Sequence, residues 1–437
     1  MKSVPGLDLA ALEPVTSHST VEPSFLGCTA ASWLARMATD GPVFRLDQDG
    51  REVYVICGHE ADLTAWRSPD DWLYGPPSSG GNFFFAELGE QHVTQLDGEA
   101  HRRMRKLILP AFGVAAVTRD LAAVAELIET GLASWRGRSI DMHPALSRLV
   151  ARALNISQLK SQLAGTDIDH LVTFEEGFIA ASSLDEPDRR RWYATDYYSR
   201  ARKVSFDYFN QVVAERESGV TRGDSLDLVI ERAARSGSPP LDQGELFSLT
   251  YLLSVAGVGN IANILCAAMW ALAEYPGWLE QLDDELGDFK PLDLKQGVGR
   301  FPILRAVISE VERCYLPAPV IPKMTATEIN FMGYRIPAGV DILQLHGLAH
   351  FQADRYDDPL SFRPDRWLVG DASRANAFGG GIHLCLGMGV TRLYVPLVLA
   401  LLARDHSWAT KEPPRLVPQL ADLPFSPETT RFDAALT

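Results

Sequence analysis

Hydrophobic residues recur at spacings of three and four along the middle of the chain. The segment 116–135, AVTRDLAAVAELIETGLASW, shows this spacing clearly, and it is typical of a helix with one buried face. The same spacing predicts that most of 99–276 is helical. Polar stretches interrupt it at 215–225 and 236–245, where they predict surface connections between helices.

Strand-like runs lie on both sides of this helical part. The first is 51–58, REVYVICG, and the second is 328–342, EINFMGYRIPAGVDI, in which Gly333 and the PAG stretch at 337–339 supply turn signals. The pattern therefore predicts a mainly α fold with small β-sheets, of class α+β. Since no stretch is long enough to serve as a linker between independent domains, we expect a single domain over 1–437.

Two long apolar stretches allow more than one interpretation. The segment 247–273 is long enough to raise the alternative of a membrane span, but Asn260 and Asn263 lie near its centre. We therefore predict a long helix through the core of a large domain. The run 393–403 is too short to span a membrane and contains Pro396, so it predicts a second core helix.

Charge narrows the classes of function. The 437 residues are 46% hydrophobic and 22% charged, an ordinary globular composition, and the formal net charge is −15. This charge argues against binding to nucleic acid or to an anionic membrane by the protein as a whole, although it allows a local basic patch.

The cysteines and the N-terminus indicate the compartment. Five cysteines are scattered along the chain without a CxxC pair, which is typical of reduced thiols and not of a disulfide framework. The first residues, MKSVPGLDLAALEPV, carry prolines and acids where a signal peptide would need an apolar core. We expect a cytoplasmic protein.

One cysteine stands in an unusual setting, 378-FGGGIHLCLGMGVTRLY-394. Three glycines from Gly379 onward allow close backbone approaches, which suggests a loop pressed against something flat or bulky. Cys385 follows where an apolar, helix-like run begins. A thiolate there would be stabilised by the helix dipole and by free backbone N–H groups, as a nucleophile or as a metal ligand. The alternative is a buried structural cysteine.

The stretch 378–387, FGGGIHLCLG, resembles the haem-binding signature FxxGxHxCxG of the cytochrome P450 family at every fixed position. The resemblance implies haem b as cofactor, with Cys385 as the axial thiolate ligand of the iron, which favours O–O cleavage. It also implies that Phe378 packs near the sulfur, that the loop at Gly379 contacts the cofactor, and that His383 contacts a haem propionate.

Three further stretches match this family in the expected order. EVER supplies Glu310 and Arg313 on one helical face, and FRPDRW supplies Arg366 as the third member of an implied structural network. DGEAHRRMRK supplies His101 and Arg105, four residues apart, which would both face a propionate. Alone, the first stretch would read as a surface ion pair and the third as a solvated helix face.

Two positions depart from the family pattern. Lys323 stands where the family usually has arginine, so its propionate contact would lack the bidentate fork. In the long helix, AGVGN places Gly259 and Asn260 where the family has an acid and an alcohol that deliver protons to dioxygen.

Three explanations are open for the missing acid and alcohol. A polar group of the substrate could hold the proton-carrying waters. The chemistry could need less proton relay, as in oxidative coupling or a peroxide-driven reaction. Or Asn260 could support water through its amide in a widened helix groove.

The resemblance implies a bacterial-type haem-thiolate monooxygenase that oxidises a small organic molecule, which we expect to be an intermediate of secondary metabolism. Electrons would come from NAD(P)H through a separate ferredoxin reductase and ferredoxin, which could dock on a basic patch of Arg102, Arg103 and Lys106. We expect a monomer without membrane or nucleic-acid partners, whose substrate could be bound to a carrier protein. The alternative is a non-catalytic haem protein, such as a gas sensor or a carrier-protein scaffold.

The resemblance also places segments near the substrate. For the three aromatic residues among them, packing beneath a loop is an equally good explanation. The expected pocket residues are Phe83, Phe84, Phe85, Leu253, Ala256, Gly257, Val320 and Phe425.

Overall fold

The structure is a computed structural model of the chain. The residues that it describes are 7–8, 15–16, 28–48, 51–74, 87–181, 186–369, 375–410 and 433–436.

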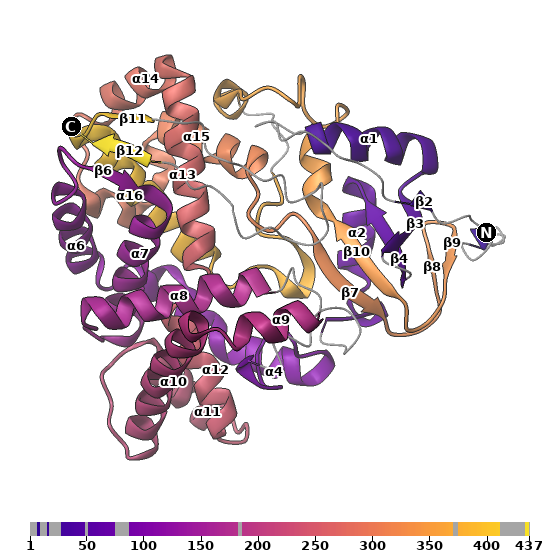
Figure 1. Cartoon of the computed structure of the whole chain (residues 1–437), viewed down its shortest axis with the longest axis horizontal. Coiled ribbons are helices and arrows are strands. Elements are labelled where there is room, and N and C mark those ends of the chain that lie inside the picture. Colours follow the sequence, from indigo (N-terminus) through magenta and orange to yellow (C-terminus); the bar gives the residue numbers. More distant parts are fainter. Residues whose placement is uncertain are drawn as a thin grey trace.

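Helices dominate one side of the molecule and a twisted sheet lies on the other (Figure 1). This confirms the mainly α fold with small sheets. The long helices are α4 (Gly98–Ile108), α6 (Leu121–Ala133), α7 (Met142–Leu159), α8 (Gly165–Ala181), α10 (Asp196–Glu217), α11 (Ser225–Arg235), α12 (Gln243–Ser254), α13 (Val258–Glu274), α14 (Pro276–Leu286), α15 (Pro302–Cys314) and α16 (Met388–Asp405). Shorter or peripheral helices are α1 (Cys28–Asp40), α2 (His59–Arg67), α5 (Val114–Val117) and α9 (Glu186–Tyr193).

The strands form one large and two small sheets. The six-stranded sheet has the order β2-β3-β4-β10-β7-β5, and the three-stranded sheets have the orders β1-β9-β8 and β11-β12-β6. The strands are β1 (Leu7–Asp8), β2 (Val15–Thr16), β3 (Val43–Gln48), β4 (Arg51–Cys57), β5 (Trp72–Leu73), β6 (Ser139–Asp141), β7 (Ile321–Thr325), β8 (Ile329–Phe331), β9 (Tyr334–Ile336), β10 (Asp341–Leu345), β11 (Trp408–Thr410) and β12 (Asp433–Leu436). Strands β4, β8, β9 and β10 confirm the two strand predictions.

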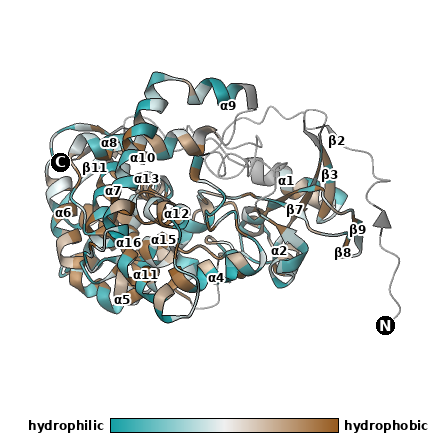
Figure 2. Ribbon diagram, turned by 90° about the horizontal axis from the view of Figure 1, so that it is seen from below, coloured by the Kyte–Doolittle hydropathy of each residue, from teal (hydrophilic) through white to brown (hydrophobic). Residues whose placement is uncertain are grey.

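The helical core is built from α7, α13, α15 and α16, which pack against one another or share neighbours. Helices α13 and α16 are apolar on nearly all sides, as expected for helices surrounded by protein. Figure 2 shows hydrophobic residues gathered where α12, α13, α15 and α16 meet. Gln243–Glu274 is the one described segment long and apolar enough to cross a membrane, and 67% of its most apolar window is buried inside the fold, as in a core helix.

The expected single helix over 247–273 is in fact broken, and this prediction was wrong in detail. Helix α12 ends at Ser254, and α13 begins at Val258 after Gly257, whose φ of 80° is left-handed. A buried amide fixes the break, because Asn155 Nδ2 on α7 donates to the Ser254 carbonyl at 3.0 Å. The predicted helix at 116–135 is likewise divided into α5 and α6.

Candidate active site

The loop before α16 is held tightly on both of its faces. The Cys385 N–H donates to the Phe378 carbonyl at 3.0 Å, which closes the loop on itself. Gly379 has a φ of 70°, which favours glycine. At Gly380 the constraint is space instead, since an added Cβ would lie 2.4 Å from the indole of Trp66 on α2. The flat group against the glycines is therefore this indole.

Cys385 differs from the other cysteines whose side chains are described. Cys57 and Cys266 are buried and Cys314 is partly buried, but Cys385 is exposed. Protein atoms nevertheless surround the Cys385 thiol, and this desolvation raises its pKa. The backbone N–H groups of Gly387 and Met388, at the start of α16, and the charge of Arg105 lower the pKa but do not outweigh the desolvation. The helix start alone does not produce a thiolate, so a bound cation such as iron would have to displace the proton.

Three side chains beside the cysteine loop suit a carboxylate ligand. His101 is 1% exposed, and its ring stacks on that of His383 with a centroid distance of 3.9 Å. Within the described part of the chain, neither ring nitrogen of His101 nor Nε2 of His383 has a hydrogen-bond partner. Arg105 donates to the Leu384 carbonyl, which ties α4 to the cysteine loop.

These groups fit a haem. Burial lowers the pKa of His101 to about 4, with Arg105 and Arg102 adding to the effect, and it lowers that of His383 to about 3. The two imidazoles are therefore neutral near pH 7 and can donate N–H groups, while Arg105 carries the positive charge. Unpartnered donors and a cation are what a buried propionate requires. The residues that would hold the cofactor are Cys385, His101, His383 and Arg105.

Lys323 lies near this cluster, in a setting that the family resemblance did not imply. Its ammonium is fully buried, donates to Gln344 Oε1 at 2.7 Å and lies 4.0 Å from the centre of the Trp72 ring. Gln344 Nε2 in turn donates to Asp62 Oδ1 at 2.6 Å. Burial lowers the pKa of Lys323 to about 7 and raises that of Asp62 to about 7. The amide thus bridges a buried amine and a buried carboxyl group, and the propionate contact of Lys323 stays a prediction.

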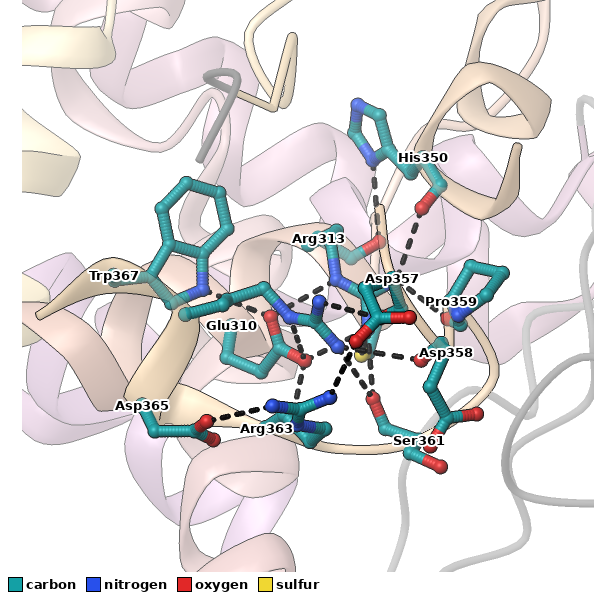
Figure 3. A network of polar contacts seen from close by, with 12 residues as sticks. Glu310, Arg313, His350, Asp357, Asp358, Pro359, Ser361, Arg363, Asp365 and Trp367 are labelled. Carbon is teal, nitrogen blue, oxygen red and sulfur yellow. Dashed lines mark hydrogen bonds and ion pairs between the residues drawn. The ribbon is translucent and has the colours of Figure 1, made fainter. Parts of the chain in front are cut away.

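Glu310, Arg313 and Arg366 lie together, and Figure 3 shows Glu310 and Arg313 within a wider network of polar contacts. Arg313 contacts both oxygens of Glu310, at 2.9 and 2.7 Å, and Arg366 Nε donates to Glu310 Oε1 at 3.2 Å. The Trp367 indole and the backbone N–H of Arg363 also donate to this carboxylate. The network joins α15 to the segment that leads toward the cysteine loop, so its placement is that of a structural element.

The first turn of α13 carries the two residues at the family's acid and alcohol positions. A Cβ added to Gly259 would meet nothing within 4 Å, and Asn260 is exposed although most of the helix is buried. Open space therefore lies beside this turn, as the sequence predicted for Gly259.

The other expected pocket residues are placed unevenly. Leu253 is buried in the helical core, and Val320 is buried in a separate cluster with Phe44 and Leu345, so neither lines an open space. Ala256 and Gly257 are partly buried. The remaining expected residues, Phe83, Phe84, Phe85 and Phe425, lie outside the described residues.

The basic patch on α4 lines a groove of about 670 Å³ between α4 and α11. Arg102 and Lys106 are exposed there, whereas Arg103 ion-pairs with Glu245 and donates to the Pro239 carbonyl. Arg102 also forms ion pairs, with Glu99 at 3.4 Å and Asp70 at 3.7 Å, but these side chains are exposed, whereas the partner of Arg103 is buried.

Sequence reasoning missed one buried acid close to the helix break. Glu175 on α8 accepts hydrogen bonds from the Tyr251 hydroxyl and from the Gly257 N–H. A sequence signal for it existed only in part, as a pair of acids in an otherwise apolar helix, 174-FEEGF-178.

Comparison with known proteins agrees with this geometry. The family model for cytochrome P450 matches residues 32–429. Cyclooctat-9-en-7-ol 5-monooxygenase of Streptomyces melanosporofaciens is 26% identical over 413 residues, which cover 86% of each chain. Pentalenene oxygenase of Streptomyces avermitilis is 26% identical over 317 residues, covering 69% of this chain and 70% of the relative.

Solved structures show the same fold. Retinoic acid-bound CYP120A1 from a cyanobacterium has a TM-score of 0.78 at 21% identity, covering 94% of this chain and 95% of the other. A zebrafish cytochrome P450 with progesterone has a TM-score of 0.77 at 18% identity, covering 93% and 99%. With the family model matching most of its length, this chain belongs to the cytochrome P450 family, and it is a haem-dependent monooxygenase.

Proposed function

We propose that this enzyme oxidises a small, mostly apolar molecule of secondary metabolism, of the cyclic terpenoid class. The observation that carries the proposal is the open space beside Gly259 and the exposed Asn260 amide, in a helix that is otherwise apolar and buried. Such a turn can accommodate an apolar skeleton and hold one polar group. Two bacterial relatives, one named for a terpene alcohol and one for pentalenene, support this class.

When bound, haem iron with a cysteine thiolate ligand supplies the oxidising power for the reaction. The chain supplies position. Arg105, His101 and His383 would hold a propionate and so fix the orientation of the cofactor, while the Trp66 indole and the glycine loop hold Cys385 in register. Gly259 leaves open space at the first turn of α13, which we propose that the substrate occupies.

Protons must reach the reaction by a route that does not use acidic or hydroxyl side chains at 259 and 260. Glycine has no side chain to ionise, and the Asn260 amide does not titrate, but it can orient water as a donor and an acceptor. We propose that Asn260 and a polar group of the substrate together hold the water at this turn.

Electron delivery is proposed to come from NAD(P)H through a ferredoxin reductase and a ferredoxin. The exposed Arg102 and Lys106 beside the groove between α4 and α11 offer positive charge to an acidic partner, on a protein whose net charge is −15. We propose a monomer in the cytoplasm, where reduced cysteines and such electron carriers occur together.

The test is a substrate panel on haem-loaded protein. Cyclic terpene hydrocarbons, their mono-alcohols, fatty acids and amino acids are titrated by the shift of the haem Soret band. Turnover with ¹⁸O₂ and a surrogate ferredoxin system is then followed by mass spectrometry. We expect a cyclic terpene alcohol to bind and to gain one labelled oxygen. Oxygen insertion into fatty acids or amino acids, with no terpenoid bound, would overturn the proposal.

A further inference from the structure

The break between α12 and α13 brings a buried carboxyl group next to the turn that lacks an acid. We propose that Glu175 of α8 is the acid of the proton route: its carboxyl group holds a proton at the break and releases it to water at the first turn of α13. The inference rests on the proposed function in one respect, which is that the oxidation consumes protons.

The contacts of Glu175 place it at this turn. The side chain is only 4% exposed, and the Tyr251 hydroxyl donates to its Oε2 at 2.6 Å. The Gly257 N–H approaches its Oε1 at 3.3 Å, and Gly257 is the residue before α13, two positions from Gly259. Gly257 is the residue that precedes the first residue of α13, and its N–H, which lies at the break, is accepted by the Glu175 carboxyl.

Glu175 differs from most other buried acids in its neighbours, and among the described residues it shares the lack of an ion pair with Asp62, which binds the Gln344 amide instead. Among the described residues, the buried Glu87, Asp224, Glu245 and Glu310 each form an ion pair with an arginine. No lysine or arginine in the described part of the chain pairs with Glu175. A carboxyl buried without a cation is stabilised in its protonated form, since desolvation penalises the charge.

The titratable groups around Glu175 do not supply that missing cation. Tyr251 faces it from α12, Tyr198 on α10 lies near Tyr251, and the His92 ring packs against Tyr251 with a centroid distance of 5.5 Å. Glu176, the neighbour on α8, adds negative charge. Burial raises the pKa of Glu175 to about 7, and the hydrogen bonds from Tyr251 and Gly257 oppose this.

The contacts of Glu175 and its raised pKa together indicate how it would transfer a proton. Near neutral pH the Glu175 carboxyl can lose its proton to a water molecule at the turn, which leaves a carboxylate held by Tyr251 and the Gly257 N–H. The carboxylate regains a proton from solvent water, and no electrons are transferred. Burial raises the pKa of Tyr251 well above its ordinary value, so this hydroxyl keeps its proton and remains a donor throughout.

A purely structural role for Glu175, as the acceptor that closes the helix break, is the alternative that an experiment must separate. Glu175→Gln keeps an oxygen for the Gly257 N–H but cannot carry the acidic proton. Glu176→Gln is the matched control, because its partly buried carboxylate lies one residue away and contacts His143 at 3.3 Å. Both variants are first checked for haem loading and thermal stability.

The first readout needs no turnover. Infrared difference spectra of the haem-loaded resting protein should show a protonated carboxyl group that is lost as pH rises through about 7. The component of this signal that belongs to Glu175 should be missing in Glu175→Gln, shift in Tyr251→Phe and persist in Glu176→Gln, whereas the contribution of Asp62, whose pKa is also raised to about 7, should persist in all three variants. If the signal is unchanged in Glu175→Gln, the inference is overturned, whatever substrate the enzyme proves to use.

The second readout is product formed per NAD(P)H consumed. We expect Glu175→Gln to bind substrate with an unchanged Soret shift and to lose about 10²-fold in product formation, in line with the usual contribution of a general acid. Wild-type coupling in Glu175→Gln, or an equal loss in Glu176→Gln, would overturn the inference. If the wild type oxidises no terpenoid but the infrared signal follows Glu175, the substrate class fails and the acid stands.

Discussion

Removing the charge of Glu310 should destabilise the protein as a whole. Its carboxylate is fully buried on α15 and accepts five hydrogen bonds. The donors are Nε and Nη2 of Arg313, Nε of Arg366, the backbone N–H of Arg363 and the indole N–H of Trp367. Glu310→Gln preserves the shape of the side chain while removing its charge. Arg313 is then left as a buried cation without a counter-charge.

The structure sets the size of this effect. Burial alone would lower the pKa of Arg313, but its hydrogen bonds with Glu310 and the charge interactions with neighbouring acidic groups together outweigh that effect and raise the pKa, so the guanidinium is charged. It also donates to the carbonyls of His350, Pro359 and Ser361, which hold it in place after the mutation. Breaking a buried pair from one side costs roughly 3–5 kcal/mol. Because native domains are stable by roughly 5–15 kcal/mol, the variant should lose about a fifth of its stability or more.

The assay is urea denaturation of haem-loaded protein, at fixed haem concentration, followed by circular dichroism and by the Soret band. Arg363→Ala is the control, because among the described residues that side chain pairs only with the exposed Asp357 and Asp365, while its backbone N–H still donates to Glu310. Surface pairs contribute little. If Glu310→Gln denatures at the same midpoint as this control, or keeps full haem loading and loses only turnover, the reasoning is refuted.

Three further changes test the site. Cys385→Ser should abolish the red-shifted Soret band of the reduced, carbon monoxide-bound protein, and a retained band would show that another residue ligates iron. Gly380→Ala should weaken haem retention, because the added Cβ would lie 2.4 Å from the Trp66 indole on α2. Gly299→Ala is the control, since its added Cβ would meet nothing within 4 Å. Equal haem retention in the two variants would contradict this reasoning. Gly259→Asp with Asn260→Thr should lower product per NAD(P)H, because an unpaired carboxylate enters the open space; better coupling than the parent would argue against substrate-assisted proton delivery.

The parts of the site that sequence predicted are those encoded by short, contiguous patterns. The cysteine loop lies within ten residues, and Glu310 and Arg313 lie one helical turn apart, so spacing alone brings them together. Arg366 required the resemblance, because no local pattern links it to α15. Hydrophobic periodicity predicted that most of 99–276 is helical, but it did not give the bounds of the individual helices, since both 116–135 and 247–273 are divided in the structure.

Features that depend on distant side chains could not be predicted in this way. The helix break needs Asn155 from α7 and Glu175 from α8, each about 80 to 100 residues before the bonds that it makes. Gln344 reaches Asp62 across 282 residues, so nothing near Lys323 in the sequence indicated that its ammonium would bind an amide. In both cases the polar groups need hydrogen-bond partners, and these partners come from residues that are distant in the sequence and close only in the folded protein.

The helix break, the missing acid and Glu175 together form one physical arrangement, and this can be tested by combining mutations. Gly259→Asp alone would add a second carboxyl two residues from Gly257, whose N–H donates to Glu175, and carboxylates that share one water-filled turn disfavour each other's charge, so coupling should fall. In the Glu175→Gln background that repulsion is absent, and the new acid should recover part of the lost product per NAD(P)H. The same mutation would thus be harmful in one background and beneficial in the other, a non-additivity expected only of groups that share one role. Independent losses in the double variant would mean that Glu175 merely closes the break and that the proton comes from the substrate side.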